Sequence, residues 1–89
     1  MPASVVTVLG KPGCHLCDVA EEVVARVADE LAAEGTPVRV ERRSILDDPA
    51  LEARYRDDVP VVLVDDRPFV RWRVDPDVLR ARLRGTAAA

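Results

Sequence analysis

Two cysteines, Cys14 and Cys17, constrain this chain most, because they stand where an apolar β-branched run gives way to a helical pattern. Residues 4–9 read Ser-Val-Val-Thr-Val-Leu, a composition typical of a strand buried on both faces of a sheet. A Gly-Lys-Pro-Gly break follows, and a helix is predicted from Cys14 until Gly35 stops it. Its apolar face is predicted from the helical spacing of Leu16, Ala20, Val23, Val27 and Leu31.

The middle of the chain predicts a second strand and a second helix. Residues 38–41 alternate valine with charged side chains, which is the pattern of a strand near a sheet edge. Residues 47–49, Asp-Asp-Pro, combine an N-cap acid with proline at the first helical position, and Leu51 and Tyr55 share one face of the short helix that follows.

The last third predicts a hairpin and a final helix. Residues 59–64 form a second strongly apolar strand, and a turn that places Asp66 at positive φ leads into a hairpin strand over 69–73. Asp75-Pro76 repeats the capping pattern and starts an amphipathic helix, with a frayed tail expected over 85–89. The order β-α-β-α-β-β-α predicts an α/β fold with a four-stranded mixed sheet flanked by helices on two faces, its two apolar strands in the centre.

Composition narrows the function classes. A length of 89 residues fits one domain, residues 1–89, and a net charge of −3 provides no basic field for nucleic acid or an anionic membrane. The N-terminus has neither a basic region nor an apolar run long enough for a signal peptide or membrane span, so we expect a cytoplasmic protein. We also expect it to be a monomer.

The position of the cysteines predicts redox chemistry. Unpaired backbone N–H groups and the helix dipole favour a thiolate at Cys14, which becomes the nucleophile. Cys17 lies one turn later on the same face and is predicted to resolve the mixed disulfide that forms on Cys14. Three acids in the first turns, Asp18, Glu21 and Glu22, partly oppose the thiolate.

A Cys-x-x-Cys pair is also compatible with other functions. A structural zinc site needs four ligands, and two cysteines with the only histidine, His15, cannot complete it. An iron–sulfur cluster held by Cys14 of two protomers and two external thiols remains an alternative, as does a redox-sensing domain without turnover.

Pro60 is unusual because a proline at the start of a central strand removes a hydrogen bond from the ladder. It is either a trans residue at the start of the strand or a cis residue. A cis Val59–Pro60 bond would leave backbone groups of Val59 beside Cys14 free to bind an extended thiol substrate.

The chain resembles the glutaredoxin-like family of the thioredoxin superfamily. The matching features are Lys11-Pro12-Gly13-Cys14-x-x-Cys17 after the first strand, Val59-Pro60, and the element order over residues 4–84. The resemblance implies a thioredoxin-like fold in which Cys14 attacks, Cys17 resolves, Pro60 is cis and Lys11 binds a thiol carboxylate. It also implies that Asp75 stands near the acidic residue that such proteins use for the γ-glutamyl amine.

The predicted activity is therefore reduction of protein or low-molecular-weight mixed disulfides. No cofactor is expected to be bound; glutathione or another low-molecular-weight thiol is a candidate reductant, and a reductase a candidate partner. His15-Leu16 differ from the Pro-Tyr of typical glutaredoxins, and Arg71-Trp72 replace their Gly-Gly pair. His15 is either a group that tunes or shuttles a proton near Cys14 or a solvated residue. Trp72 is either a stacking wall for a partner or a cover over a sheet edge or helix seam.

Overall fold

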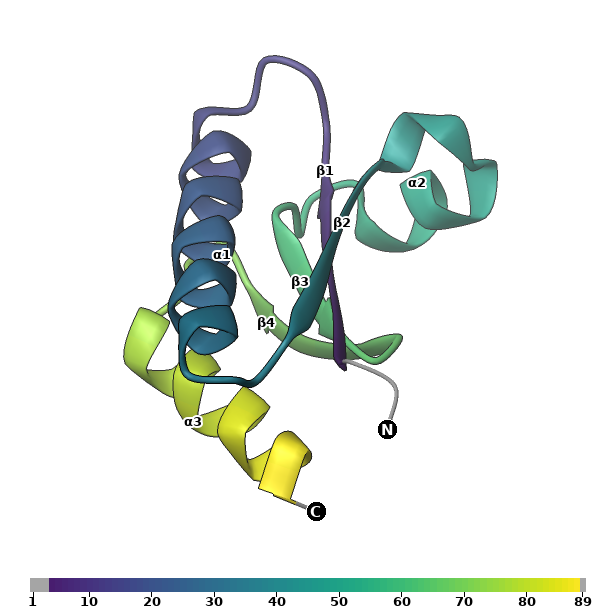
Figure 1. The fold of residues 1–89 in the computed structure, drawn as a ribbon. Coiled ribbons are helices and arrows are strands. Elements are labelled where there is room, and N and C mark those ends of the chain that lie inside the picture. Colours follow the sequence, from purple (N-terminus) through teal and green to yellow (C-terminus); the bar gives the residue numbers. More distant parts are fainter. Residues whose placement is uncertain (1–3, 89) are drawn as a thin grey trace.

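The computed structural model describes residues 4–88 of the chain. The elements follow the predicted order, with one added turn of 3₁₀ helix, η1, before α2 (Figure 1). Their bounds are β1 (Ser4–Gly10), α1 (His15–Ala33), β2 (Val38–Ser44), η1 (Ile45–Asp47), α2 (Pro49–Tyr55), β3 (Val61–Val64), β4 (Arg67–Arg71) and α3 (Pro76–Ala88).

The four strands form one mixed sheet in the order β2-β1-β3-β4. β1 pairs in parallel with β2 and antiparallel with β3, and β3 pairs antiparallel with β4. The two apolar strands therefore occupy the centre of the sheet, as predicted. Figure 1 shows α1 and α3 on one face of the sheet and α2 on the other. The predicted α/β architecture is confirmed.

Alternation along β1 and β3 divides the buried residues between the two faces. On the face of α1 and α3, strand residues such as Val6 and Val8 pack against both helices. We call this cluster the main core: Val6, Val8, Ala20, Val24, Val27, Leu31, Val62, Val64, Leu79 and Leu83. On the other face lies a smaller group, the cysteine cluster: Leu9, Cys17, Ile45, Val59, Val61 and Leu63, with Cys14, Leu51 and Tyr55 partly buried against it.

A two-residue turn joins β3 to β4. Asp65 and Asp66 both have positive φ, 50° and 68°, so the expected positive φ at Asp66 is confirmed and Asp65 shares it. Such tight turns suit the twist of a hairpin, so β4 begins directly at Arg67 rather than at residue 69 as predicted. Asp65 also lies against β1, where its N–H donates to the Val5 carbonyl (2.8 Å) and its Oδ1 accepts from the Val5 N–H (2.9 Å).

Two other strand boundaries differ from the prediction. β2 continues to Ser44 because it pairs with the whole of β1, up to Gly10, and its polar residues are acceptable on an edge strand. β3 begins at Val61 rather than 59, since Pro60 has no N–H and its carbonyl accepts from the Trp72 N–H at 2.7 Å instead.

Two of the helices, α1 and α3, also differ from the prediction. Leu16, predicted to be buried, is 46% exposed, whereas Val24, which was not expected in the apolar face, is fully buried. Leu16 lies in the first turn of α1, where the adjacent Cys17 occupies the buried position instead. The helix α3 continues to Ala88 instead of fraying from residue 85, because one glycine costs a helix only about 1 kcal/mol; Ala89 lies outside the described residues. Within residues 4–88, no helix is long and apolar enough to cross a membrane.

Candidate redox site

The two cysteines lie at the start of α1, as the sequence predicted. Gly13 adopts a φ of +73°, which favours glycine, and turns the chain into the helix. Cys14 is the N-cap, with extended backbone angles, and its Sγ accepts a hydrogen bond from the Cys17 N–H at 3.2 Å. The Cys14 sulfur therefore accepts a hydrogen bond from an N–H group that has no backbone partner in the first turn of the helix.

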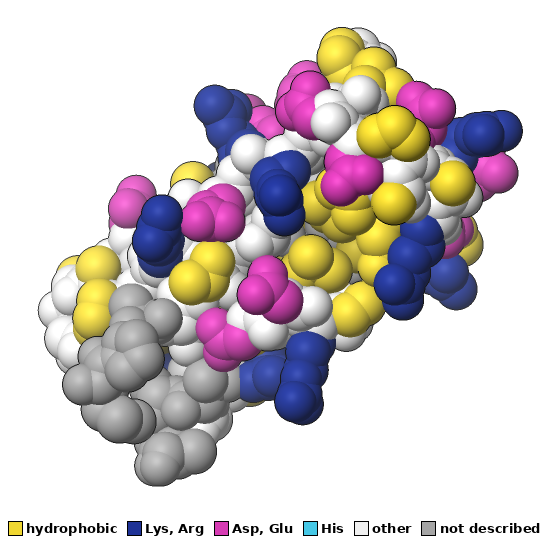
Figure 2. Space-filling view, turned by 90° about the vertical axis from the view of Figure 1, so that its right-hand side faces the viewer, with side chains coloured by type: hydrophobic (Ala, Val, Ile, Leu, Met, Phe, Trp, Pro, Cys, Tyr) yellow, Lys and Arg dark blue, Asp and Glu magenta, His cyan; other side chains and the backbone are white. Residues whose placement is uncertain are grey.

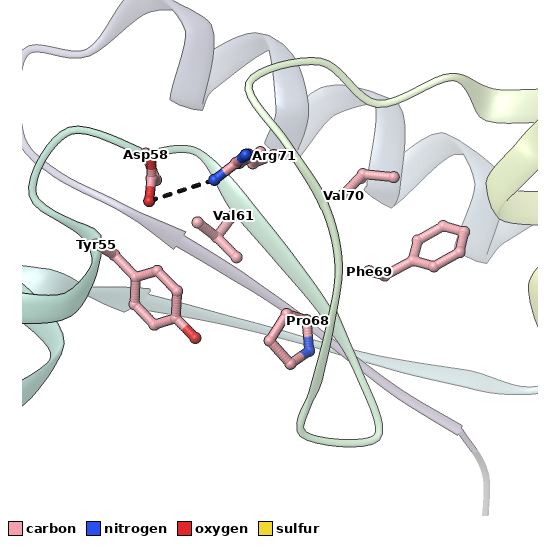
Figure 3. Close-up of a pocket in the computed structure, with 7 residues that line it drawn as sticks. All are labelled: Tyr55, Asp58, Val61, Pro68, Phe69, Val70 and Arg71. Carbon is pink, nitrogen blue, oxygen red and sulfur yellow. Dashed lines mark ion pairs between the residues drawn. The ribbon is translucent and has the colours of Figure 1, made fainter.

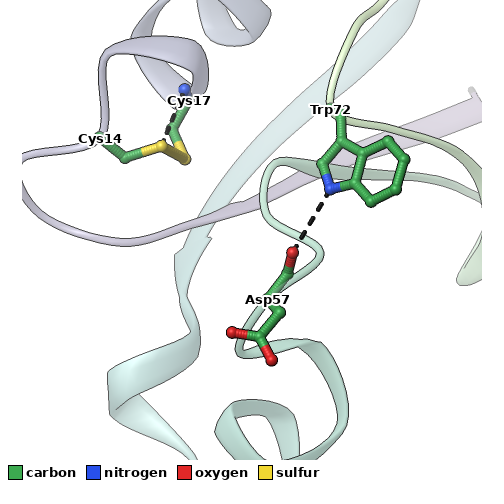
Figure 4. Close-up of a disulfide and its surroundings, with 4 residues drawn as sticks. All are labelled: Cys14, Cys17, Asp57 and Trp72. Carbon is green, nitrogen blue, oxygen red and sulfur yellow. Dashed lines mark hydrogen bonds between the residues drawn. A yellow bond between two sulfur atoms is a disulfide. The ribbon is translucent and has the colours of Figure 1, made fainter.

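Cys14 and Cys17 are joined by a disulfide, and their Cα atoms lie 5.2 Å apart (Figure 4). This separation is within the usual range of bridged cysteines, so closing the bond needs no rearrangement of the backbone. A bridge over so few residues removes little entropy from the unfolded chain, which makes a purely stabilising role a poor explanation. The arrangement supports a redox role for the pair.

The two sulfurs differ in exposure. Cys17 is only 3% exposed and belongs to the cysteine cluster, whereas Cys14 is half-buried. A molecule arriving from solvent therefore meets Cys14 first.

Gly10 makes the burial of Cys17 possible. A Cβ at residue 10 would lie 3.1 Å from the Cys17 Cβ and 3.2 Å from its Sγ, closer than ordinary contacts. The absence of a side chain lets the end of β1 approach the second cysteine. The sequence predicted only a strand break at Gly10, although a glycine that follows a buried strand and precedes a Cys-x-x-Cys pair is a signal for such an approach.

Charge around the first turns of α1 is mixed. Asp18 is the acid of the first turn and is exposed, while Glu21 pairs with Arg42 of β2 at 3.4 Å. The opposing negative charge predicted at the thiolate is thus partly compensated at Glu21. The N-terminal end of α1 favours an anionic sulfur at Cys14.

The structure places the predicted substrate-binding residues in different surroundings. Val59 is 8% exposed and packs in the cysteine cluster, and the Val59–Pro60 peptide bond is cis, as expected. Lys11 and His15 are exposed on either side of Cys14 in the chain. Asp75 caps α3, where its Oδ1 accepts from the N–H groups of Asp77 (2.8 Å) and Val78 (3.4 Å). The Asp75 carboxylate therefore caps the start of α3, as its position before Pro76 predicted.

A set of contacts that the sequence did not predict joins the end of β4 to the segment before β3. The Trp72 N–H donates to the Pro60 carbonyl (2.7 Å), and its indole Nε1 donates to the Asp57 carbonyl (3.4 Å; Figure 4). Arg71 pairs with Asp58 at 3.6 Å beside a hollow of about 230 Å³, in which the Tyr55 ring faces the strand (Figure 3). Trp72 has a φ of 69°, an arrangement that costs a bulky residue about 1–3 kcal/mol.

Hydrophobic side chains also gather on the surface near α2. Figure 2 views the side of the molecule on which α2 lies and shows an apolar patch bordered by side chains of both charges. Among residues 4–88, no group of three or more histidine, cysteine, aspartate or glutamate side chains is arranged to hold a metal ion.

Comparison with known families gives one match over most of the chain. A family model described as a glutaredoxin-like domain (DUF836) matches residues 5–84. An uncharacterised protein of Mycobacterium tuberculosis (strain H37Rv) is 34% identical over 76 residues, which cover 85% of this chain and 78% of the relative.

Solved structures show the same architecture. A structural-genomics target protein from X. campestris is 31% identical, with a TM-score of 0.69, covering 90% of this chain and 96% of its own. Protein Ne2328 from Nitrosomonas europaea is 27% identical, with a TM-score of 0.64 and coverage of 93% and 94%. Chloroplastic thioredoxin z, at 14% identity, has a TM-score of 0.75 with coverage of 98% and 80%, a likeness of fold alone.

Proposed function

Because the chain belongs to the glutaredoxin-like domain family, we propose that it is a thiol–disulfide oxidoreductase in which Cys14 attacks and Cys17 resolves. The observation that carries this proposal is the disulfide at the N-terminus of α1, with one sulfur accessible and the other buried. A dithiol of this kind exchanges electrons with substrate disulfides without any bound cofactor.

The first step takes place at Cys14 in the reduced protein. The Cys14 thiolate attacks one sulfur of a substrate disulfide, so a bond forms between Cys14 and that sulfur while the substrate S–S bond breaks. The second substrate sulfur leaves as a thiolate and takes a proton from solvent. The Cys17 N–H at 3.2 Å and the end of the helix dipole stabilise the anionic Cys14 that begins this step.

The second step takes place at Cys17. This thiol loses its proton to solvent and attacks the Cys14 sulfur, which forms the observed Cys14–Cys17 disulfide and releases the remaining substrate thiolate. The protein is oxidised by two electrons and the substrate disulfide is reduced to two thiols. Burial of Cys17 keeps it out of reach of other disulfides until the mixed disulfide has formed.

The other residues predicted to bind substrate have the following roles in these two reaction steps. Val59, which packs with both cysteines, would offer backbone groups to an extended substrate beside Pro60. Lys11 and His15 would meet anionic groups of the substrate near Cys14, and Asp75 an amine. Glutathione or another low-molecular-weight thiol would return the protein to its dithiol form, or a reductase would do so, in the reducing environment of the cytoplasm.

The test compares Cys14→Ser with Cys17→Ser. The fully reduced protein, freed of reductant, is mixed with a peptide joined by a disulfide to 5-thio-2-nitrobenzoate, and the coloured thiolate is followed. Cys14→Ser is expected to lose the rapid release, because Cys17 is buried. Cys17→Ser is expected to keep the release and to accumulate a protein–peptide mixed disulfide, which mass spectrometry detects. Equal behaviour of both variants and the wild type would reject the mechanism.

A further inference from the structure

Trp72 combines two features that a residue serving only to cover the fold does not need. Trp72 is 49% exposed, although a covering aromatic residue is expected to be buried. Its φ of 69° belongs to a region that bulky residues rarely adopt and that surrounding contacts must maintain. Such backbone outliers cluster at ligand-binding and catalytic sites.

The contacts that maintain this conformation also fix the ring. The backbone N–H is bonded to Pro60, the indole Nε1 to Asp57, and the Arg71 guanidinium lies 4.9 Å from the ring centroid. Arg71 is itself held by Asp58. The indole is therefore held in place before a ligand arrives, which reduces the entropy that binding must overcome.

The same contacts join Trp72 to the chain segment that packs against the redox pair. Asp57 and Pro60 lie two residues before and one residue after Val59, whose side chain packs in the cysteine cluster with Cys14 and Cys17. Figure 4 shows the indole in the surroundings of the disulfide. A substrate that extends from Cys14 along this segment would bring its neighbouring residues to Trp72.

The chemistry of this surface favours an apolar side chain. The positive charge of Arg71 is paired with Asp58. The surface at Trp72 therefore consists of an aromatic ring next to a neutralised ion pair. Leu16, between the two cysteines in the chain, is a second apolar side chain left 46% exposed. We propose that Trp72 contacts the substrate and selects polypeptide disulfides in which an apolar residue flanks the cysteine. This inference rests on the oxidoreductase function proposed above.

The test uses two short peptides that differ only beside the cysteine, Leu-Cys-Leu and Gly-Cys-Gly, each joined by a disulfide to 5-thio-2-nitrobenzoate. The second-order rate constant of thiolate release is measured for the reduced full chain. The wild type is expected to react roughly tenfold faster with the leucine peptide. Trp72→Ala is expected to remove this preference by slowing the leucine peptide, with the glycine peptide within about twofold of wild type.

Two further variants separate recognition from folding. Trp72→Phe is expected to restore most of the preference, and Val40→Ala, which removes an exposed apolar group (37%) from the opposite edge strand, is expected to leave both rates unchanged. Equal wild-type rates for the two peptides, or an equal loss of both rates in Trp72→Ala, would overturn the selection by Trp72 while leaving the oxidoreductase function intact. Absence of release from both peptides in the wild type would reject the oxidoreductase function itself.

A second readout needs no substitution at residue 72. Trp72 is the only tryptophan of the chain, so its fluorescence reports on this site alone. In Cys17→Ser carrying a trapped peptide, the emission is expected to shift to shorter wavelength with the leucine peptide and not with the glycine peptide. Identical spectra for the two trapped complexes would contradict contact between the indole and the flanking side chain.

Discussion

The two faces of the sheet differ in the number of residues that they bury. The main core joins the sheet to α1 and α3 through ten residues that are all at most 2% exposed. The cysteine cluster on the other face has six buried residues, and α2, which covers it, contributes no fully buried side chain. The difference indicates that one face provides most of the stability, while the half-buried Cys14 packs against the thinner face.

The largest expected effect comes from truncating one leucine on each face. Leu79 is fully buried in the main core, so Leu79→Ala is expected to lower the free energy of unfolding by about 3 kcal/mol. Leu51 is half-buried beside the cysteine cluster, so Leu51→Ala is expected to lower it by about 1 kcal/mol. Urea unfolding of the oxidised proteins measures both. Equal losses would show that the two faces share the stability evenly.

Gly10→Ala sharpens the comparison inside the cysteine cluster. The added methyl group would meet Cys17 at 3.1–3.2 Å, and the displaced thiol is expected to resolve the mixed disulfide roughly tenfold more slowly. The expected loss of stability is about 1 kcal/mol. Stopped-flow mixing with a peptide disulfide measures the attack of Cys14 and the release by Cys17 separately. A slower first step with an unchanged second step would contradict this assignment of Gly10.

The smallest effect concerns an ion pair that joins α1 to α3. Arg80 binds Glu30 through Nε (2.6 Å) and Nη2 (3.2 Å), and this hydrogen bonding lowers the pKa of Glu30 below its ordinary value of 4.5. A carboxyl with a lowered pKa in the folded state stabilises the protein above its unfolded pKa, and loses that contribution as the pH falls through the folded pKa. Glu30→Gln should therefore be less stable than wild type at pH 7, and the difference should shrink below about pH 4.5. A difference that stays constant on acidification would mean that the charge of Glu30 does not contribute.

Much of this molecule was predictable because its signals are local. The valine-rich runs of β1 and β3, the proline-marked starts of α2 and α3, and the position of Cys14 at a helix start all depend on neighbours in the chain. The element order, the central place of the apolar strands and the location of the redox pair followed from them.

The remaining features depend on residues that are distant in the sequence. The last three residues of β2 are polar and become a strand only because β1 is there to pair with them. Gly10 matters because Cys17 of another element lies against it, and the exposure of Trp72 follows from its bonds to Asp57 and Pro60. Apart from the glycine that precedes the Cys-x-x-Cys pair, no local pattern carries this information.

The turn between β3 and β4 lies at the end of the sheet away from the cysteines, and Asp65 joins this turn to β1. The Asp65 carboxylate accepts from the Val5 N–H, and the Asp65 backbone N–H donates to the Val5 carbonyl. These two hydrogen bonds extend the pairing of β1 with β3 by one residue. A slip of β3 by one residue along β1 would break these two hydrogen bonds. It would also turn Val61 and Leu63 to the face of α1 and α3, because adjacent strand residues point in opposite directions. The turn thus helps to fix the register between β1 and β3. Through this register, an aspartate remote from the sulfur atoms influences which apolar side chains surround Cys17.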